Sequence, residues 1–354
     1  MKKAKKILAV IFTASFCGFC LLFPFSVKEA AAEGINRCIF VIIPSLYAMM
    51  TASAILMKSG LISCAGRFIR PVSRLFFGIN GELGGILLFS LIAGYPVGAK
   101  MIYSVYTEGR LSKRGAEVLS GLCFGSGAAF VFGCAASSAA VGGVILLSNI
   151  LADLILAALL SRYLLKNCQA EESTPKTSVN FGVLNDCIVS SGRSMLEVCL
   201  CIVIFAVFSE MLRTYNILPI IAEILPVGMG EPVLCAILDV TAISGISARL
   251  PVVSGLISFG GVCVFLQITA IFRGKLSILP LVVIRIAAAV LSGVICRLLM
   301  PFIMSNEAVD VFAVTGRLYR ETSPIPSVML IIMSCVLIAE SFKGKIFAKK
   351  GRDF

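Results

Sequence analysis

The sequence predicts an all-α protein that crosses a membrane several times, with about eight transmembrane helices and two re-entrant hairpins in inverted repeats. Composition is the first observation behind this prediction, because 58% of the 354 residues are hydrophobic and the mean hydropathy is +1.00. The second is that uncharged apolar runs recur along the whole chain. Several runs reach the roughly 17 to 25 residues that span a bilayer as a helix.

These apolar runs define the predicted spans in chain order. The first run follows a lysine-rich start and is longer than the roughly 7 to 15 apolar residues of a secretory signal, so we expect a retained anchor helix. The predicted spans cover residues 7–25, 36–57, 117–136, 138–160, 195–213, 251–272, 276–302 and 325–342.

The basic residues serve as topology signals in this interpretation. The net charge is +12, and most of the 31 lysines and arginines lie in short connections beside apolar runs. Cytoplasmic loops of membrane proteins carry an excess of Lys and Arg, so this pattern predicts a cell-membrane protein with both termini in the cytoplasm. The lipid bilayer is therefore the expected partner of these segments, and nucleic acid is not expected.

One apolar segment, residues 82–106, is interrupted by helix breakers and a charge. Gly94, Pro96 and Gly98 break the helical pattern, and Lys100 follows them. Irregular backbone at membrane depth is tolerated only where it is buried in protein or lines a wet cavity, so we expect a re-entrant hairpin with its tip at this turn. Two plainer readings stay open: Gly94 and Gly98 allow two helices to approach closely, and Lys100 snorkels to the interface. The preceding amphipathic segment, 61–77, is expected to lie on the cytoplasmic surface.

A second copy of this arrangement follows in the other half of the chain. Gly81-Glu82 recurs as Gly230-Glu231, and Ala99-Lys100 recurs as Ala248-Arg249, which places a second hairpin at 231–250. The charge count gives the two copies opposite orientations, the usual plan of a secondary transporter. The predicted organisation is an anchor helix (1–34), a first repeat (35–168), a polar linker (169–180), a second repeat (181–304), and a final helix with a basic cytoplasmic tail (305–354).

Enzymatic and metal chemistry receive little support from the residue types. The chain contains no histidine, which removes the commonest general base and the commonest metal ligand. Most of the 14 cysteines lie inside apolar runs, where they pack as small hydrophobic side chains. We therefore expect no catalytic residues, no bound metal and no cofactor, apart from a coupling ion.

Three stretches carry a resemblance to a known family. They are the string from Gly94 to Lys100, the later Asp239-Val240-Thr241, and the string from Phe259 to Cys263 with Gln267. This pattern resembles the Gate, or nucleoside-recognition, domain of multi-pass sporulation integral membrane proteins, over roughly residues 35–300. Gate domains are distantly similar to concentrative nucleoside transporters, so the resemblance implies two hairpin tips that face each other around a substrate.

The candidate site residues lie at the two predicted hairpins and on the spans beside them. Asp239 is the candidate ion-coupling residue, because its carboxylate and the hydroxyl groups that follow it suit sodium or a proton. A salt bridge from Asp239 to Arg249 is the plainer alternative. Asp153 and Arg285 lie well inside their spans and are expected to be paired. The candidate substrate-binding residues are Gly94, Tyr95, Pro96, Gly98, Lys100, Ser126, Thr241, Ser244, Ser247, Arg249 and Gln267.

The functional expectation is a transporter of a small polar solute such as a nucleoside, coupled to an ion and associated with sporulation. The alternative is a structural or assembly protein of the sporulation membrane that does not transport. Substrate, direction, coupling ion and assembly into a homo-oligomer stay open.

Overall fold

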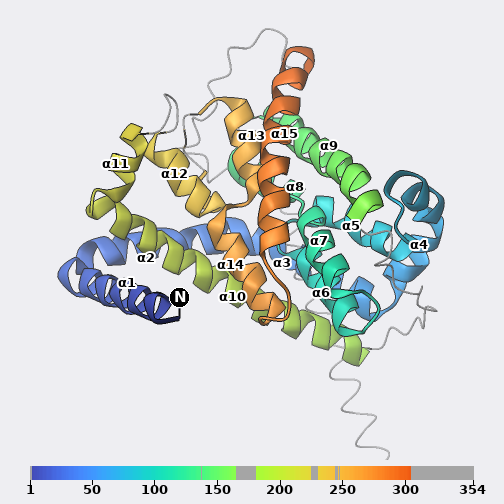
Figure 1. Ribbon diagram of the computed structural model, residues 1–354, viewed down its shortest axis with the longest axis horizontal. Coiled ribbons are helices and arrows are strands. Elements are labelled where there is room, and N and C mark those ends of the chain that lie inside the picture. The colour runs from blue at the N-terminus through green and yellow to red at the C-terminus, as the bar shows by residue number, and fades with distance from the viewer. Residues whose placement is uncertain are drawn as a thin grey trace, which may run out of the picture. The chain divides into compact units, whose positions relative to one another are not determined.

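The computed structural model describes residues 2–136, 138–164, 181–224, 230–243, 246 and 248–303, all within one compact unit, Met1–Ala313. Every regular element among these residues is helical, which confirms the all-α class (Figure 1). The α-helices are α1 Lys2–Leu22, α2 Pro24–Arg37, α3 Ile43–Lys58, α4 Leu61–Val72, α5 Gly81–Ala93, α6 Val97–Thr107, α7 Lys113–Leu122, α8 Ala128–Phe130, α9 Ala139–Leu164, α10 Phe181–Thr214, α11 Ile217–Ile224, α12 Glu231–Leu238, α13 Leu250–Phe259, α14 Gly261–Phe272 and α15 Leu279–Ile303. Short π or 3-10 turns extend them: η1 Cys38–Ile42, η2 Ser73–Phe77, η3 Val131–Ala135 and η4 Val240–Ile243.

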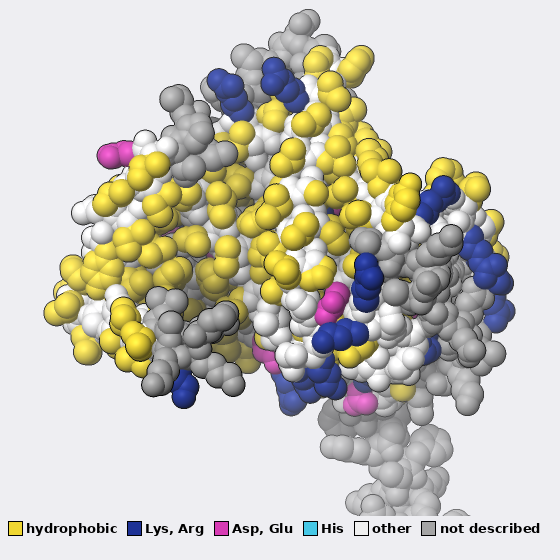
Figure 2. All heavy atoms as spheres, in the orientation of Figure 1, with side chains coloured by type: hydrophobic (Ala, Val, Ile, Leu, Met, Phe, Trp, Pro, Cys, Tyr) yellow, Lys and Arg dark blue, Asp and Glu magenta, His cyan; other side chains and the backbone are white. Residues whose placement is uncertain are grey.

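Five helical segments in the described part of the chain are long and apolar enough to cross a membrane, or six if one bent pair counts as a span. Hydrophobic side chains cover much of the face formed by α10, α11, α14 and α15, while Lys and Arg gather near α6 and α7 and along α4 (Figure 2). An apolar outer surface is what helices facing lipid require. The protein is therefore a multi-pass membrane protein. The five segments are Pro24–Lys58, Ala139–Tyr163, Phe181–Thr214, Leu250–Phe272 and Leu279–Phe302.

Two predicted spans are interrupted, which corrects the expectation of continuous helices. The segment predicted at 117–136 stops at Leu122 and resumes at Ala128, with extended or irregular backbone between them. The segment predicted at 251–272 breaks at Gly260, where φ is +84°. Both breaks contain glycines in the left-handed region, which other residues rarely adopt. Apolar composition alone did not reveal them, since the flanking residues are hydrophobic on both sides.

The span predicted at 7–25 crosses a helix boundary, because α1 ends at Leu22 and α2 begins at Pro24, and its apolar part, Val10–Leu22, is shorter than the five spanning segments. Other predicted bounds shift without changing the helices they belong to. The span predicted at 36–57 is part of a longer segment that begins at Pro24, and the one predicted at 195–213 is the second part of α10. The predicted span at 325–342 and the linker at 169–180 lie outside the described residues.

A near right-angle bend joins α4 and η2 to α5. The angle between the segments Leu61–Phe77 and Gly81–Ala93 is 87°, as in a broken span or a re-entrant loop. The two segments cross closely at Gly66 and Gly81, where a Cβ on Gly66 would lie 2.7 Å from the Glu82 nitrogen. The exposed side chains of α4 include Phe68, and its basic residues are Arg67 and Arg70. Such an amphipathic helix suits a membrane surface.

The core is built where α9, α13 and α15 pack together, and α10 runs beside α2 and α3. Small polar side chains connect the first three helices: Ser254 on α13 lies 2.8 Å from Ser292 on α15, and Asn149 on α9 reaches Ser254 at 3.5 Å. Asp153 on α9 and Arg285 on α15 form a fully buried ion pair, which confirms the predicted pairing. Polar contacts of this kind fix the lateral packing of helices that are otherwise uniformly apolar.

Candidate functional site

The first chain break, Gly94–Pro96 between α5 and α6, packs directly on the break between α7 and α8. A Cβ built on Gly127 would lie 2.9 Å from the Cα of Gly94, and one on Gly98 would overlap the carbonyl oxygen of Cys123. Gly94 and Gly127 also adopt positive φ, at +94° and +72°. Glycine is therefore required on both sides of this contact, first for conformation and then for close approach.

The second pair of breaks repeats this arrangement in the other half of the chain. Asp239 ends α12, and the next residues pack against the break between α13 and α14. A Cβ built on Gly261 would lie 2.9 Å from the backbone nitrogen of Val240. One on Gly260 would lie 2.6 Å from the ring of Phe124, which belongs to the first pair of breaks. All four breaks consequently meet in the interior of the molecule.

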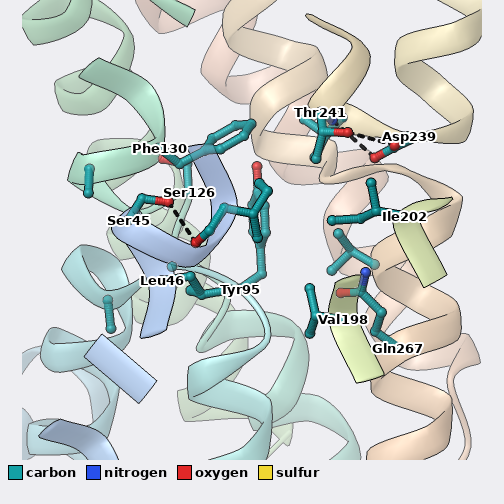
Figure 3. A pocket seen from close by; sticks show the side chains of 17 residues that line it. Ser45, Leu46, Tyr95, Ser126, Phe130, Val198, Ile202, Asp239, Thr241 and Gln267 are labelled. Atoms are coloured by element: carbon teal, nitrogen blue, oxygen red, sulfur yellow. Dashed lines mark hydrogen bonds between the residues drawn. The ribbon is translucent and has the colours of Figure 1, made fainter. Parts of the chain in front are cut away.

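A small central cavity lies between these breaks, with a volume of about 40 Å³ open to the centre of a water molecule. Figure 3 shows Tyr95, Ser126 and Phe130 on one side of it and Asp239, Thr241 and Gln267 on the other. Since a buried water needs about 10 to 15 Å³ by this measure, the cavity has room for a few waters. Its lining residues are Ile42, Ser45, Leu46, Ala93, Gly94, Tyr95, Ser126, Gly127, Ala129, Phe130, Val198, Ile202, Asp239, Val240, Thr241, Val264 and Gln267.

Asp239 is the charged side chain of the central cavity. Its carboxylate accepts hydrogen bonds from the backbone nitrogen of Thr241 at 3.0 Å and from the Thr241 hydroxyl at 2.6 Å, the contacts drawn in Figure 3. Arg37 at the end of α2 lies 4.0 Å away through Nη1. The cation beside Asp239 is thus Arg37, whereas Arg249, the alternative suggested by the sequence, is exposed at the start of α13.

The remaining polar groups of the cavity differ in whether they have hydrogen-bond partners. The Tyr95 hydroxyl donates to the carbonyl of Ile257 at 3.1 Å, so the phenol bridges the first break and α13. Gln267 reaches Cys263 Sγ at 3.4 Å through its amide nitrogen. The Ser126 hydroxyl is buried and has no hydrogen-bond partner among the described residues. A buried hydroxyl in that state costs free energy, and a polar occupant of the cavity can relieve this cost.

Arg285 contacts the first pair of breaks through Phe124. Its Nη1 donates to the carbonyl of Phe124 at 2.8 Å, its Nη2 binds Asp153, and its guanidinium lies 4.9 Å from the centre of the Phe124 ring. The Phe124 ring in turn lies 4.8 Å from the ring of Tyr95. The buried ion pair is thereby connected to the cavity wall through two aromatic side chains.

Of the twelve predicted site residues, six line the central cavity, four lie outside its lining, and two fall outside the described residues. Gly98 is buried in α6, and Pro96 is the N-cap residue of that helix. Lys100 donates to the Ser194 hydroxyl at 2.8 Å and does not line the cavity, and neither does exposed Arg249. Ser244 and Ser247 lie outside the described residues. The six that line the cavity are Gly94, Tyr95, Ser126, Asp239, Thr241 and Gln267.

Several lining residues escaped the sequence analysis. Ile42 and Leu46 near the start of α3, and Val198 and Ile202 on α10, carry no local signal because their neighbours are equally apolar. Arg37, the last residue of α2, was not among the predicted site residues, although a charge at the edge of an apolar run could have suggested a partner inside. No group of three or more Cys, Asp or Glu side chains suited to a metal ion occurs in the described ranges.

Comparison with known proteins gives one match. The chain is 23% identical over 313 residues to the sporulation integral membrane protein YlbJ of Bacillus subtilis (strain 168), covering 77% of each sequence. No family model matches the chain, and no solved structure matches it. The chain is therefore similar over most of its length to a sporulation integral membrane protein.

Proposed function

We propose that this multi-pass membrane protein is a carrier that binds a small polar solute, such as a nucleoside, in the central cavity. The observation that carries the proposal is the convergence of four chain breaks, two from each half of the chain, on one buried cavity. Discontinuous helices that meet near the middle of a membrane protein are the usual construction of a transporter binding site. The four breaks supply backbone groups and polar side chains there without exposing them to lipid.

The arrangement of the two halves supports inverted repeats with two re-entrant hairpins. In each half a broken helix pair precedes a second interrupted helix and then a long one, α9 or α15. Each hairpin also begins with Gly-Glu, and each glutamate binds an arginine: Glu82 binds Arg110 at 2.6 Å, and Glu231 binds Arg213. Corresponding elements in the same order are expected if an ancestral unit was duplicated.

The small volume of the central cavity means that the proposed carrier is described in a closed state, without room for its solute. A few waters fit, whereas a nucleoside requires the two hairpins to move apart. Asp239 suits coupling to sodium or a proton, because a carboxylate at this depth gains from a cation that accompanies the solute. In this scheme Arg37 neutralises Asp239 when no ion is bound.

The name of the Bacillus subtilis relative links that protein to sporulation, and the Gate-like residues around Gly94, Asp239 and Gly260 in this chain agree with such a link. We extend the sporulation association to this chain as part of the proposal. The same name favours one alternative, a protein of the sporulation membrane that keeps the fold for structure or assembly and transports nothing.

Uptake of radiolabelled nucleosides into proteoliposomes tests the proposal. We expect saturable uptake whose initial rate falls about tenfold or more in Asp239→Asn, a loss of about 1.4 kcal/mol or more. The matched control is Asp186→Asn, which makes the same change at a carboxylate that is 71% exposed, and it should keep the normal rate.

Absence of uptake across a panel of nucleosides, amino acids and sugars by folded protein contradicts the carrier. If, in addition, Asp239→Asn supports normal sporulation, the structural alternative replaces it.

A further inference from the structure

A second cavity adjoins the central one on the side of α2, α10 and α12. It has a volume of about 190 Å³ by the same measure and a mainly polar lining, and we call it the vestibule. Its walls include both acidic and basic side chains, whereas Asp239 supplies the charge of the central cavity. Its charged lining residues are Glu33, Arg37, Glu210, Arg213 and Asp239, and Cys235 also lies in its wall.

The vestibule is lined by exposed residues as well as by the buried residue that it shares with the central cavity. Side-chain exposure along it falls from 51% for Arg213 through 19% for Arg37 to 3% for Asp239. Asp239 lines both cavities, and Arg37 approaches it from the vestibule side at 4.0 Å. The carboxylate of Asp239 and its contact with Arg37 therefore lie where the two cavities adjoin.

The charges of the vestibule favour cations. Arg37 is bound to Glu33 and lies near Asp239, and Arg213 is bound to Glu210 and to Glu231, so each arginine faces two carboxylates. The other charged groups on the surrounding helices do not reverse this balance: Lys28 and Glu29 on α2 oppose each other, and Glu223 on α11 is acidic. A cavity with an excess of one sign and low-dielectric walls concentrates ions of the opposite sign.

We propose that the vestibule is the water-filled entrance to the central cavity, that it admits cations in preference to anions, and that the contact between Arg37 and Asp239 closes its inner end. The role of the vestibule as a route for solute or ions rests on the proposed carrier function. Its charge preference stands on the vestibule alone and can be measured without transport.

Cys235, a native thiol in the vestibule wall, serves as the probe of charge preference. Full-length protein in membranes is treated with a cationic trimethylammonium-ethyl or an anionic sulfonatoethyl methanethiosulfonate, and modification of Cys235 is followed by peptide mass spectrometry. The ratio of the cationic to the anionic modification rate at Cys235 is divided by the same ratio for 2-mercaptoethanol in the same buffer, which corrects for the intrinsic reactivities of the two reagents. We expect a preference for the cation of about tenfold that decreases with added salt. The variant Glu33→Gln/Glu210→Gln should bring the ratio near that of the free thiol.

The inner closure is tested with a thiol placed at Ser126, in the central cavity. In Ser126→Cys we expect slow reaction with the cationic reagent, and about tenfold faster reaction when Arg37→Gln is added, since the contact with Asp239 is then lost. The matched control is Glu33→Gln, which removes the other partner of Arg37 and also weakens the attraction for cations, so it should not raise the Ser126→Cys rate.

Equal reaction of Cys235 with both reagents, faster reaction with the anion, or no reaction with either overturns the entrance. An unchanged Ser126→Cys rate in Arg37→Gln overturns the closure. If Cys235 prefers the cation but the protein shows no uptake, the entrance is supported and the carrier function is rejected. If the protein shows uptake but Cys235 does not react, the carrier function is supported and the entrance is rejected.

Discussion

At the scale of single residues, the site depends on glycines whose missing side chains let chain breaks touch. Gly98, on α6, is the strictest of these, because a Cβ there would overlap the carbonyl oxygen of Cys123 at the end of α7. Glycine at this position was visible in the sequence as part of a broken apolar run. Its contact with a second break, more than twenty residues further along, was not.

Gly98→Ala should therefore destabilise the protein by about 1 to 3 kcal/mol, the range typical of overpacking. The matched control is Gly143→Ala on α9, where a Cβ meets nothing within 4 Å and alanine favours the helix. Thermal unfolding in detergent, followed by circular dichroism, should show a lower midpoint for Gly98→Ala alone. A similar midpoint for the two variants contradicts the close contact.

The buried ion pair gives the second prediction at this scale. Arg285→Met leaves the Asp153 carboxylate buried without its partner and should cost about 3 to 5 kcal/mol. In Asp153→Leu/Arg285→Met no charge is stranded, so the double variant should be more stable than Arg285→Met. The Phe124 carbonyl still loses its donor there, so full recovery is not expected. A double-mutant cycle on unfolding in denaturant measures this, and additive losses argue against the pair.

At the scale of elements, corresponding helix starts carry corresponding ion pairs in different surroundings. Glu82 at the start of α5 is 5% exposed and binds Arg110, while Glu231 at the start of α12 is 29% exposed and binds Arg213. The recurrence of Gly-Glu was apparent in the sequence, and the arginine partners were not. Those partners come from a loop in one case and from α10 in the other.

Burial should decide what these pairs contribute. We expect Glu82→Gln to cost about 1.5 to 3 kcal/mol, as for buried hydrogen bonds to charged groups. Glu231→Gln, the same change in a more exposed pair, should cost about 1 kcal/mol or less. Chemical denaturation of the two variants compares them directly. Equal losses of unfolding free energy in the two variants would contradict the larger contribution expected of the buried pair.

At the scale of the whole molecule, the predicted orientation places the vestibule on the outer side of the membrane. The loop before α12 contains no Lys or Arg, whereas α4 carries Arg67 and Arg70 and is assigned to the inside. A membrane-impermeant thiol reagent applied to intact cells should modify Cys235 and leave exposed Cys64 on α4 unmodified. Inside-out vesicles should give the opposite result, and the reverse pattern in both preparations inverts the topology.

The sequence by itself determined that this chain is helical, that it crosses a membrane several times, and that Gly94 and Asp239 lie at interruptions of apolar helices. Those properties depend on composition and on local backbone chemistry, both of which are readable along the chain. The tertiary structure alone decided that Lys100 turns to Ser194, that Arg37 rather than Arg249 meets Asp239, and that α3 and α10 complete the cavity wall. In a membrane protein, lipid-facing and interior positions are both apolar, so sequence periodicity carries little record of which side of a helix faces the site.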